Sequence, residues 1–202
     1  MKVQQAVTYR GKRMKLMYFD LETTGVSFWK HGIHQIAGAI EIDGKVEQFF
    51  EFKVQPNPAA LIEDEALAVG NVTRAELEFY PTMQAVYGEL TKMLGTYVDK
   101  FNKTDKFFLV GYNNCSFDNP FLRAFFVQNG DQYFGSWFWS STIDVMVLAA
   151  EYLKLERHKM PDFKQGTVAK WLGIAVDDSK LHDAKYDVEV LMEIYKYVSL
   201  PV

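Results

Sequence analysis

Short apolar runs bounded by turn residues characterise the first part of the chain. Residues 15–21 form one such run, and residues 33–42 and 46–54 form two more that are rich in β-branched and aromatic side chains. Asp43-Gly44 separates the last two runs and is typical of a two-residue hairpin turn. This pattern predicts three consecutive strands, with the second and third joined as a hairpin.

Helical spacing of apolar residues becomes frequent further along the chain. We expect a short helix at 62–67, and then a helix that begins at Thr73, where Glu76 completes a capping box. A long amphipathic helix is predicted at 82–101, because its apolar residues recur every three or four positions. Later helices are predicted at 118–128, 144–153, 167–172 and 182–198, with Asp144 as the cap of the second.

Two further strands are expected between these helices. Residues 106–112 form a dense apolar run, which is typical of a strand buried in a parallel sheet, and residues 140–143 form a shorter one. The order of elements predicts an α/β fold, with a mixed five-stranded sheet flanked by helices. A hairpin-linked start followed by two crossover strands is the layout of ribonuclease H-like domains.

The composition is that of an ordinary globular chain, with 202 residues of which 49% are hydrophobic and 24% charged. We expect one domain at 15–202, preceded by a tail or added strand at 1–14. No run of 18 apolar residues exists, and the basic start lacks the apolar segment of a signal peptide. The single cysteine excludes an internal disulfide and a Cys-rich zinc site, so we expect a reducing, cytoplasmic location.

The net charge of −4 argues against broad, tight binding to duplex nucleic acid, which requires many phosphate contacts. It leaves nuclease chemistry open, because acids gathered at one metal site would account for much of the excess negative charge.

Asp20-Leu21-Glu22 ends the first predicted strand and is followed by Thr23-Thr24-Gly25. Residues two apart on a strand point to the same face, so the two carboxylates can reach one cation. The Asp-x-Glu pattern is common by itself, since it recurs at Asp187-Val188-Glu189. The apolar strand that carries Asp20 and Glu22 favours function, because buried strands seldom hold two acids without a partner.

Two further motifs complete a set of chemically useful residues. Asp118 follows the apolar strand 106–112 at the start of a helix, where it is a candidate ligand or simply a helix cap. His182 and Asp187 begin the last helix, with His182 expected in the loop or first turn and Asp187 one turn inside. The alternatives are a helix-start histidine bonded to backbone and an acid on a solvated face.

Several carboxylates brought to one point cannot all remain ionised without cations between them. Hard oxygen ligands favour Mg²⁺, with Mn²⁺ as a substitute. Two such ions, about 4 Å apart, form the two-metal site that commonly hydrolyses a phosphodiester bond. The motifs therefore predict a site with two Mg²⁺ ions and a histidine that accepts a proton near neutral pH.

The motifs Asp-x-Glu-Thr-Thr-Gly, Asn-x-x-Phe-Asp and His-x-x-x-x-Asp, in this order, resemble the three exonuclease motifs of the DEDDh (DnaQ-like) family. This family includes the epsilon proofreading subunit of the bacterial replicative polymerase and related RNA-trimming enzymes. The resemblance covers roughly residues 15–200. Residue 183 is Asp, so the sister subclass with a tyrosine four positions before the last Asp does not fit.

The resemblance implies a metal-dependent 3′→5′ exonuclease that releases nucleoside 5′-monophosphates from single-stranded 3′ ends. It implies metal ligands at Asp20, Glu22, Asp118 and Asp187, with His182 as general base. The expected substrate-binding residues are Thr23, Thr24, Gly25, Asn114 and Phe117, joined by Arg157, Lys159 and Lys164 as candidate phosphate contacts. The expected partners are nucleic-acid 3′ ends and a DNA polymerase or another replication or repair complex.

Three departures from the family pattern bear on substrate choice. Asn113 stands where many relatives have His, Gln35 stands where an acid is common, and Phe28-Trp29-Lys30-His31 is an unusually aromatic loop. DNA is the expected substrate, with RNA trimming as the alternative. A non-catalytic nucleic-acid-binding module and an internally cutting ribonuclease H-like nuclease are the other classes considered.

Overall fold

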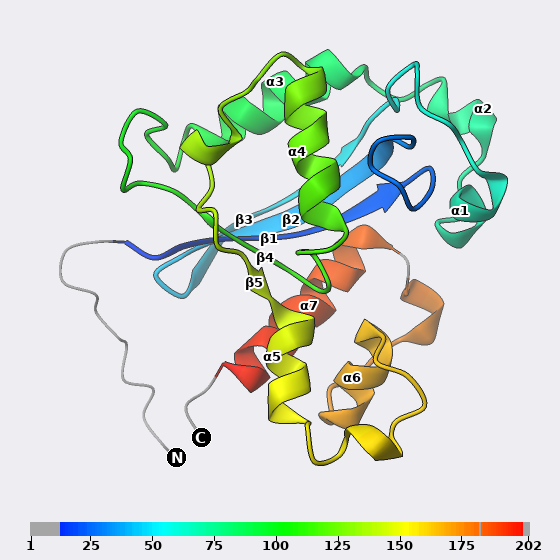
Figure 1. Ribbon diagram of the computed structural model, residues 1–202, viewed down its shortest axis with the longest axis vertical. Helices are drawn as coiled ribbons and strands as arrows, with labels where there is room; N and C mark the ends of the chain where they lie inside the picture. The colour runs from blue at the N-terminus through cyan, green and yellow to red at the C-terminus, as the bar shows by residue number, and fades with distance from the viewer. Residues whose placement is uncertain (1–12, 182, 200–202) are drawn as a thin grey trace.

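A mixed five-stranded sheet forms the centre of the molecule, and its strands lie in the order β3-β2-β1-β4-β5 (Figure 1). The computed structural model describes residues 13–181 and 183–199. The strands are β1 (Lys15–Thr23), β2 (Ile33–Ile42), β3 (Lys45–Lys53), β4 (Phe108–Gly111) and β5 (Ile143–Asp144). β1, β2 and β3 pair antiparallel, whereas β4 pairs parallel with β1 and β5 parallel with β4. The predicted ribonuclease H-like α/β architecture is therefore confirmed.

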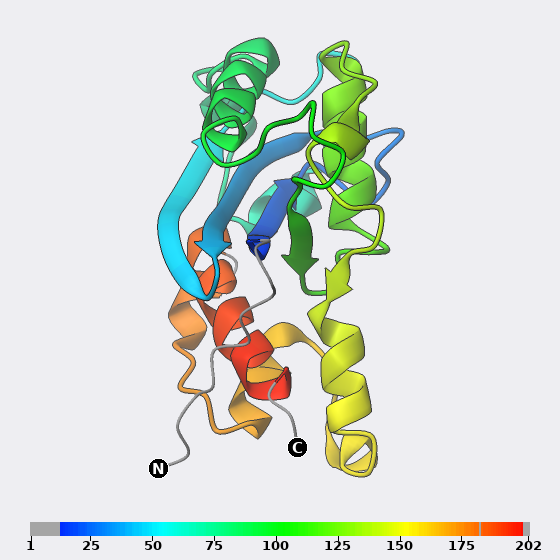
Figure 2. The ribbon, with the colours of Figure 1, turned by 90° about the vertical axis from the view of Figure 1, so that its left-hand side faces the viewer.

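Helices cover both faces of this sheet, with α3 and α4 on one side and α5, α6 and α7 on the other (Figures 1 and 2). The small helices α1 and α2 lie beyond the end of β1. The α-helices are α1 (Asp64–Val69), α2 (Arg74–Leu77), α3 (Met83–Leu94), α4 (Asp118–Gln128), α5 (Val145–Tyr152), α6 (Gln165–Trp171) and α7 (Ala184–Val198). Short 3-10 helices occur at Phe134–Ser136, Arg157–Lys159 and Asp178–Lys180.

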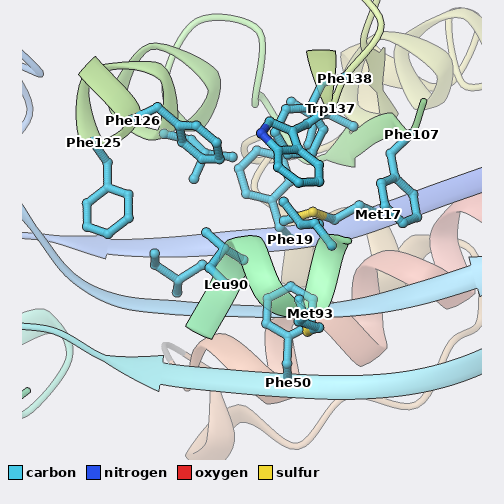
Figure 3. Close-up of a cluster of buried hydrophobic side chains, with 14 of the residues drawn as sticks. Met17, Phe19, Phe50, Leu90, Met93, Phe107, Phe125, Phe126, Trp137 and Phe138 are labelled. Atoms are coloured by element: carbon cyan, nitrogen blue, oxygen red, sulfur yellow. The ribbon is translucent and has the colours of Figure 1, made fainter. Parts of the chain in front are cut away.

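Alternation along β1 divides the interior into two apolar cores. Met17, Phe19 and Leu21 point into a core formed with α3 and α4. Figure 3 shows Met17 and Phe19 in this core, together with Leu90 and several aromatic side chains such as Phe126. Leu16 and Tyr18 enter the core formed with α5, α6 and α7. Because β1 is covered on both faces, its side chains from Lys15 to Phe19 are all buried.

The hairpin and the helix caps follow the sequence prediction. Asp43 and Gly44 have φ angles of 52° and 82°, which suit a two-residue hairpin turn with both central residues in the left-handed region. Thr73 and Glu76 form the predicted capping box, and the carboxylate of Asp144 accepts a bond from the Met146 amide at 3.0 Å.

Several predicted boundaries were displaced. The helix expected at 62–67 spans Asp64–Val69, the strand expected at 140–143 is Ile143–Asp144, and the helix expected at 167–172 spans Gln165–Trp171. The helix expected at 182–198 spans Ala184–Val198, and Asp183 is its cap and accepts a bond from the Tyr186 amide at 2.9 Å.

The helix predicted at 82–101 ends at Leu94, so its C-terminal part was wrong. Gly95 terminates it, and the carbonyl of Tyr97 accepts a hydrogen bond from the Lys15 ammonium at the start of β1. Tyr97 and Val98 keep the apolar spacing of a helix, but they lie in the turn that follows α3. Contacts of this turn with β1 therefore outweigh the helical pattern of the local sequence.

Among the described residues, no helix combines the length and apolar character needed to cross a membrane. Residues 1–12 and His182 lie outside the described part of the chain, and so do the predictions made for them.

Candidate active site

Two acids lie at the carboxyl end of β1 on the face covered by α7. Tyr18, Asp20 and Glu22 alternate with residues of the opposite core, so Asp20 and Glu22 continue the row of side chains that begins with Leu16 and Tyr18. Both acids are half-buried. The strand thus delivers two carboxylates beside the start of the last helix.

Asp187 approaches these acids from the first turn of α7. The Asp183 cap sets the start of this helix, and the Asp187 amide donates to the Asp183 carbonyl at 2.9 Å. The Gln165 side chain donates to the Asp187 carbonyl at 2.8 Å, which ties α6 to the same turn. One carboxylate oxygen from each of Asp20, Glu22 and Asp187 lies within 4.8 Å of the other two.

Asp118 reaches the site from the first residue of α4 and is 4% exposed. The loop before it is built on Asp144, whose carboxylate accepts the backbone amides of Asn113 at 3.0 Å and Cys115 at 3.3 Å. Asn113 has a φ of 59°, a conformation that Asn adopts more easily than most residues.

The electrostatics identify the four acids as one cluster. Burial, followed by the charges of Asp118, Glu22 and Asp187, raises the pKa of Asp20 well above its usual range. Burial and the charges of Asp187, Asp118 and Asp183 raise the pKa of Glu22 to about 8. Burial raises the pKa of Asp118 to about 7, although hydrogen bonds from backbone amides oppose the shift. Full ionisation of the cluster is therefore costly without a cation.

The donor set fits a hard divalent cation. Mg²⁺ binds oxygen at about 2.1 Å in octahedral geometry, which places its ligand oxygens roughly 3–4 Å apart. Carboxylate oxygens that already lie within 4.8 Å of one another need only a small contraction to reach that spacing. Within the described chain, Asp20, Glu22 and Asp187 are the only such group of three possible ligands.

The segment Thr23-Thr24-Gly25 forms a tight turn directly after the acids. The Thr24 hydroxyl donates to the Leu61 carbonyl at 2.7 Å and accepts the Gly32 amide at 3.0 Å. A side chain at Gly25 would place its Cβ 2.5 Å from the His31 ring, so this position requires glycine. The Thr23 hydroxyl donates to the Gly25 carbonyl at 2.9 Å.

Asn114 and Phe117 support the loop that carries Asp118. The fully buried Asn114 side chain donates to Thr142 Oγ1 at 2.8 Å, and Thr142 donates to the Leu109 carbonyl at 2.8 Å. Phe117 packs on Phe121, with ring centroids 5.2 Å apart. The substrate-binding roles of Asn114 and Phe117 stay predictions.

Arg157 and Lys159 are not brought to the acids. Their segment connects α5 to α6 at the bottom of Figure 1, whereas β1 ends beside α1, and the second view keeps this separation (Figures 1 and 2). Arg157 lies over the Phe163 ring with 5.0 Å to its centroid, and Lys159 pairs with Glu156 at 2.6 Å. Lys164, the third candidate, precedes α6 at its N-terminal cap position.

Two residues near the site were not identified from the sequence as parts of it. Asp144 was predicted only as a helix cap, but it also fixes the Asn113–Cys115 backbone. His34 lies in the irregular pairing near the start of β2, and a Cβ built on Gly70 would be 3.8 Å from both Glu22 Oε2 and His34 Cε1. Burial lowers the pKa of His34 to about 4, so its imidazole is neutral at pH 7. The irregular pairing of β1 with β2 places His34 here, and no local sequence pattern predicts this irregularity.

Comparisons with known proteins agree with this geometry. The sequence model of a family described as exonuclease, RNase_T, matches residues 17–195. The PolC-type DNA polymerase III of Mycoplasma pneumoniae is 28% identical over 192 residues, which are 92% of this chain but 12% of that protein. The chain therefore spans only a small part of the length of this relative.

The fold also matches solved structures. Escherichia coli exonuclease I in complex with a dT13 oligonucleotide has a TM-score of 0.72 and 21% identity, covering 92% of this chain and 41% of that chain. The zinc-bound form of the same enzyme with single-stranded DNA has a TM-score of 0.71 and 20% identity, covering 93% of this chain and 40% of that one. At this identity the likeness shows the shared fold.

Proposed function

The chain belongs to the exonuclease family whose model it matches over residues 17–195, and from this membership we propose that it removes nucleotides from the 3′ ends of single-stranded DNA. The observation that carries the proposal is the convergence of Asp20, Glu22 and Asp187, whose carboxylate oxygens lie within 4.8 Å of one another. The product of each cycle would be a nucleoside 5′-monophosphate. Water is the second substrate, so no further co-reactant is needed.

The four acids would hold two divalent cations, with Mg²⁺ as the ion expected. Asp20, Glu22 and Asp187 are the proposed ligands of one ion, and Asp20 with Asp118 those of the other. When bound, the ions would supply Lewis-acid stabilisation of the charge that develops on the phosphate oxygens and on the leaving group. The fixed backbone around β1 and the first turns of α4 and α7 would keep these ligands in place.

The proposed hydrolysis requires a base for the attacking water. The water oxygen forms a bond to phosphorus while the bond from phosphorus to the leaving 3′ oxygen breaks. His182 is the proposed acceptor of the water proton, because an imidazole titrates near neutral pH. In the sequence it stands five residues before Asp187.

DNA is the proposed substrate because the names of the similar proteins refer to DNA. The PolC-type relative is a DNA polymerase, and exonuclease I was solved with a dT13 oligonucleotide. The same relative supports a proposed association with a DNA polymerase, since the matched segment is 12% of that protein.

The deciding experiment is product analysis on a 5′-labelled single-stranded DNA oligomer with Mg²⁺, beside the Asp20→Ala variant and an EDTA control. We expect a ladder that shortens from the 3′ end and that neither control produces. A matched RNA oligomer and a circular single-stranded DNA serve as comparison substrates. Faster trimming of RNA would overturn the choice of DNA, and cleavage of the circle would overturn exonuclease action in favour of internal cutting.

A further inference from the structure

An open, basic and aromatic surface lies at the opposite end of the sheet from the acids. It consists of Lys100, Phe101, Lys103 and Lys106 from the segment between α3 and β4, together with the half-buried Trp139, and it lies over the buried Trp137; it is called the lysine–aromatic surface below. Phe101 is 86% exposed and borders a groove of about 440 Å³ that Trp137 also lines. Figure 1 shows the segment in green at the left, away from α1 and the end of β1.

The lysines of this surface lie over aromatic rings. The Lys100 ammonium is 5.5 Å from the ring centroids of both Phe101 and Trp137. The Lys106 ammonium is 5.4 Å from the centroid of Trp139 and also donates to the Gly135 carbonyl. Cations and ring faces are therefore presented together, which suits a ligand with both phosphates and flat bases.

The positive charge of this surface is not cancelled locally. Within the described chain, none of Lys100, Lys103 and Lys106 pairs with a carboxylate. Asp105 pairs with Lys15 and accepts the Asp99 amide at 3.0 Å. With Asp105 paired to Lys15, residues 99–106 present three lysines against one remaining carboxylate, that of Asp99, and so carry a net positive charge.

Hydrogen bonds fix the backbone that carries the exposed Phe101 ring. The Phe101 amide donates to the Asp99 carboxylate at 3.0 Å, and the Asn102 amide donates to the Asp99 carbonyl at 2.9 Å. The Thr104 amide donates to the Asn102 side chain at 3.0 Å. An exposed phenylalanine on a turn bonded in this way loses little freedom when a base stacks on it.

We propose that the lysine–aromatic surface is a second binding site for single-stranded DNA, which holds the strand upstream of the 3′ end. The proposal rests on the proposed function, because it gives the trailing part of the same substrate a place on the protein. The three lysines supply cations for the phosphates, and the open groove leaves room for bases to stack regardless of sequence.

The separation of the two sites sets a length requirement. Lys15, at the amino end of β1, contacts this segment, while Asp20 and Glu22 lie toward the carboxyl end of the strand. Seven residue steps separate Lys15 from Glu22, which is about 23 Å along the strand. At a stacked spacing of about 3.4 Å per nucleotide, a DNA strand needs at least about seven nucleotides to reach from one site to the other.

The test is oligomer binding by fluorescence anisotropy in EDTA, where the metal-dependent cleavage cannot occur. Phe101→Ala and Lys100→Glu are compared on a DNA of about 5 nucleotides and one of about 30. We expect the dissociation constant for the long oligomer to rise about tenfold, since one lost stacking contact accounts for a change of that size. Phe101→Trp should restore binding of the long oligomer, and the short oligomer, which cannot span both sites, should bind the wild type more weakly than the long one.

Lys154→Glu is the matched control, because it makes the same charge change on a lysine that follows α5 and pairs with Glu151. It should leave both dissociation constants unchanged. The proposal is overturned if the surface variants bind the long oligomer as the wild type does, or if Lys154→Glu weakens it equally. Because binding is measured without cleavage, a chain that binds long DNA through this surface but trims none would contradict only the proposed exonuclease function.

Discussion

The carboxylate of Asp144 accepts the backbone amide of Asn113 at 3.0 Å, and this bond joins β5 to the loop that delivers Asp118. The same oxygen caps α5 through the Met146 amide at 3.0 Å. One side chain outside the acid cluster therefore fixes both a helix start and the approach of a proposed metal ligand.

Replacing Asp144 with Ala should destabilise the protein by roughly 2–3 kcal/mol, because a helix cap and bonds to a charged acceptor are lost together. Activity should also fall, since the loop before Asp118 loses its anchor. Asp144→Asn is the matched control, as its side-chain oxygen can still cap α5. Urea unfolding and turnover, measured for both variants, check this; equal losses in the two would contradict the anchoring role.

Replacing Asp20 with Asn should abolish turnover, with a loss of about a thousandfold or more, because several kcal/mol of metal-dependent stabilisation disappears. Without metal the variant should be more stable than the wild type, because one member of a repelling cluster is neutral. Mg²⁺ should raise the melting temperature of the wild type and leave the variant nearly unchanged. A metal-induced shift of equal size in both proteins would place the ion elsewhere.

The metal-free protein should become less stable as the pH rises from about 5 to about 8.5. Because the pKa of Glu22 is raised to about 8 and that of Asp118 to about 7, the folded state binds protons more tightly than the unfolded chain. The stability is therefore greatest below the unfolded pKa and is lost as the pH passes the folded values.

We expect this loss to be several kcal/mol, because each tenfold difference in proton affinity between the folded and unfolded states corresponds to about 1.4 kcal/mol. Urea unfolding in EDTA at the two pH values measures it. Glu22→Gln should reduce the slope, and Mg²⁺ should flatten it by compensating the ionised cluster. A wild-type stability that is level or rises over this interval would mean that the carboxyl groups are not perturbed as described.

Replacing His182 with Ala should lower turnover at neutral pH by about 10²–10⁴-fold, which is the usual contribution of a positioned base. The Mg²⁺-induced rise in melting temperature should persist, because His182 is not a proposed metal ligand. Turnover across pH 6–9 in the variant and wild type provides the measurement. Activity within a few-fold of the wild type would remove the histidine from the mechanism.

Replacing Thr24 with Val should cost about 1–3 kcal/mol, because the buried Gly32 amide and Leu61 carbonyl both lose their partner. Thr24→Ser keeps the hydroxyl and should remain close to the wild type in unfolding experiments. If Val leaves stability intact but raises KM, the Thr24 hydroxyl serves the substrate rather than the turn.

Much of the fold was determined by local sequence. The alternation along residues 15–23 and the Asp43-Gly44 turn were sufficient to predict the hairpin-linked strands, since both effects act between neighbouring residues. The family was likewise predicted from three motifs in order, and the match over residues 17–195 confirmed it.

Tertiary structure alone decided where elements stop and which candidates meet. The helix at α3 ends at Leu94 because the following turn contacts Lys15, far away in sequence. Asp20, Glu22 and Asp187 come together, whereas Arg157 and Lys159 lie at the far end of the helical layer. Residue types and spacing specify which chemistry is available, but the distance between side chains from different elements depends on packing across the sheet, which no local pattern encodes.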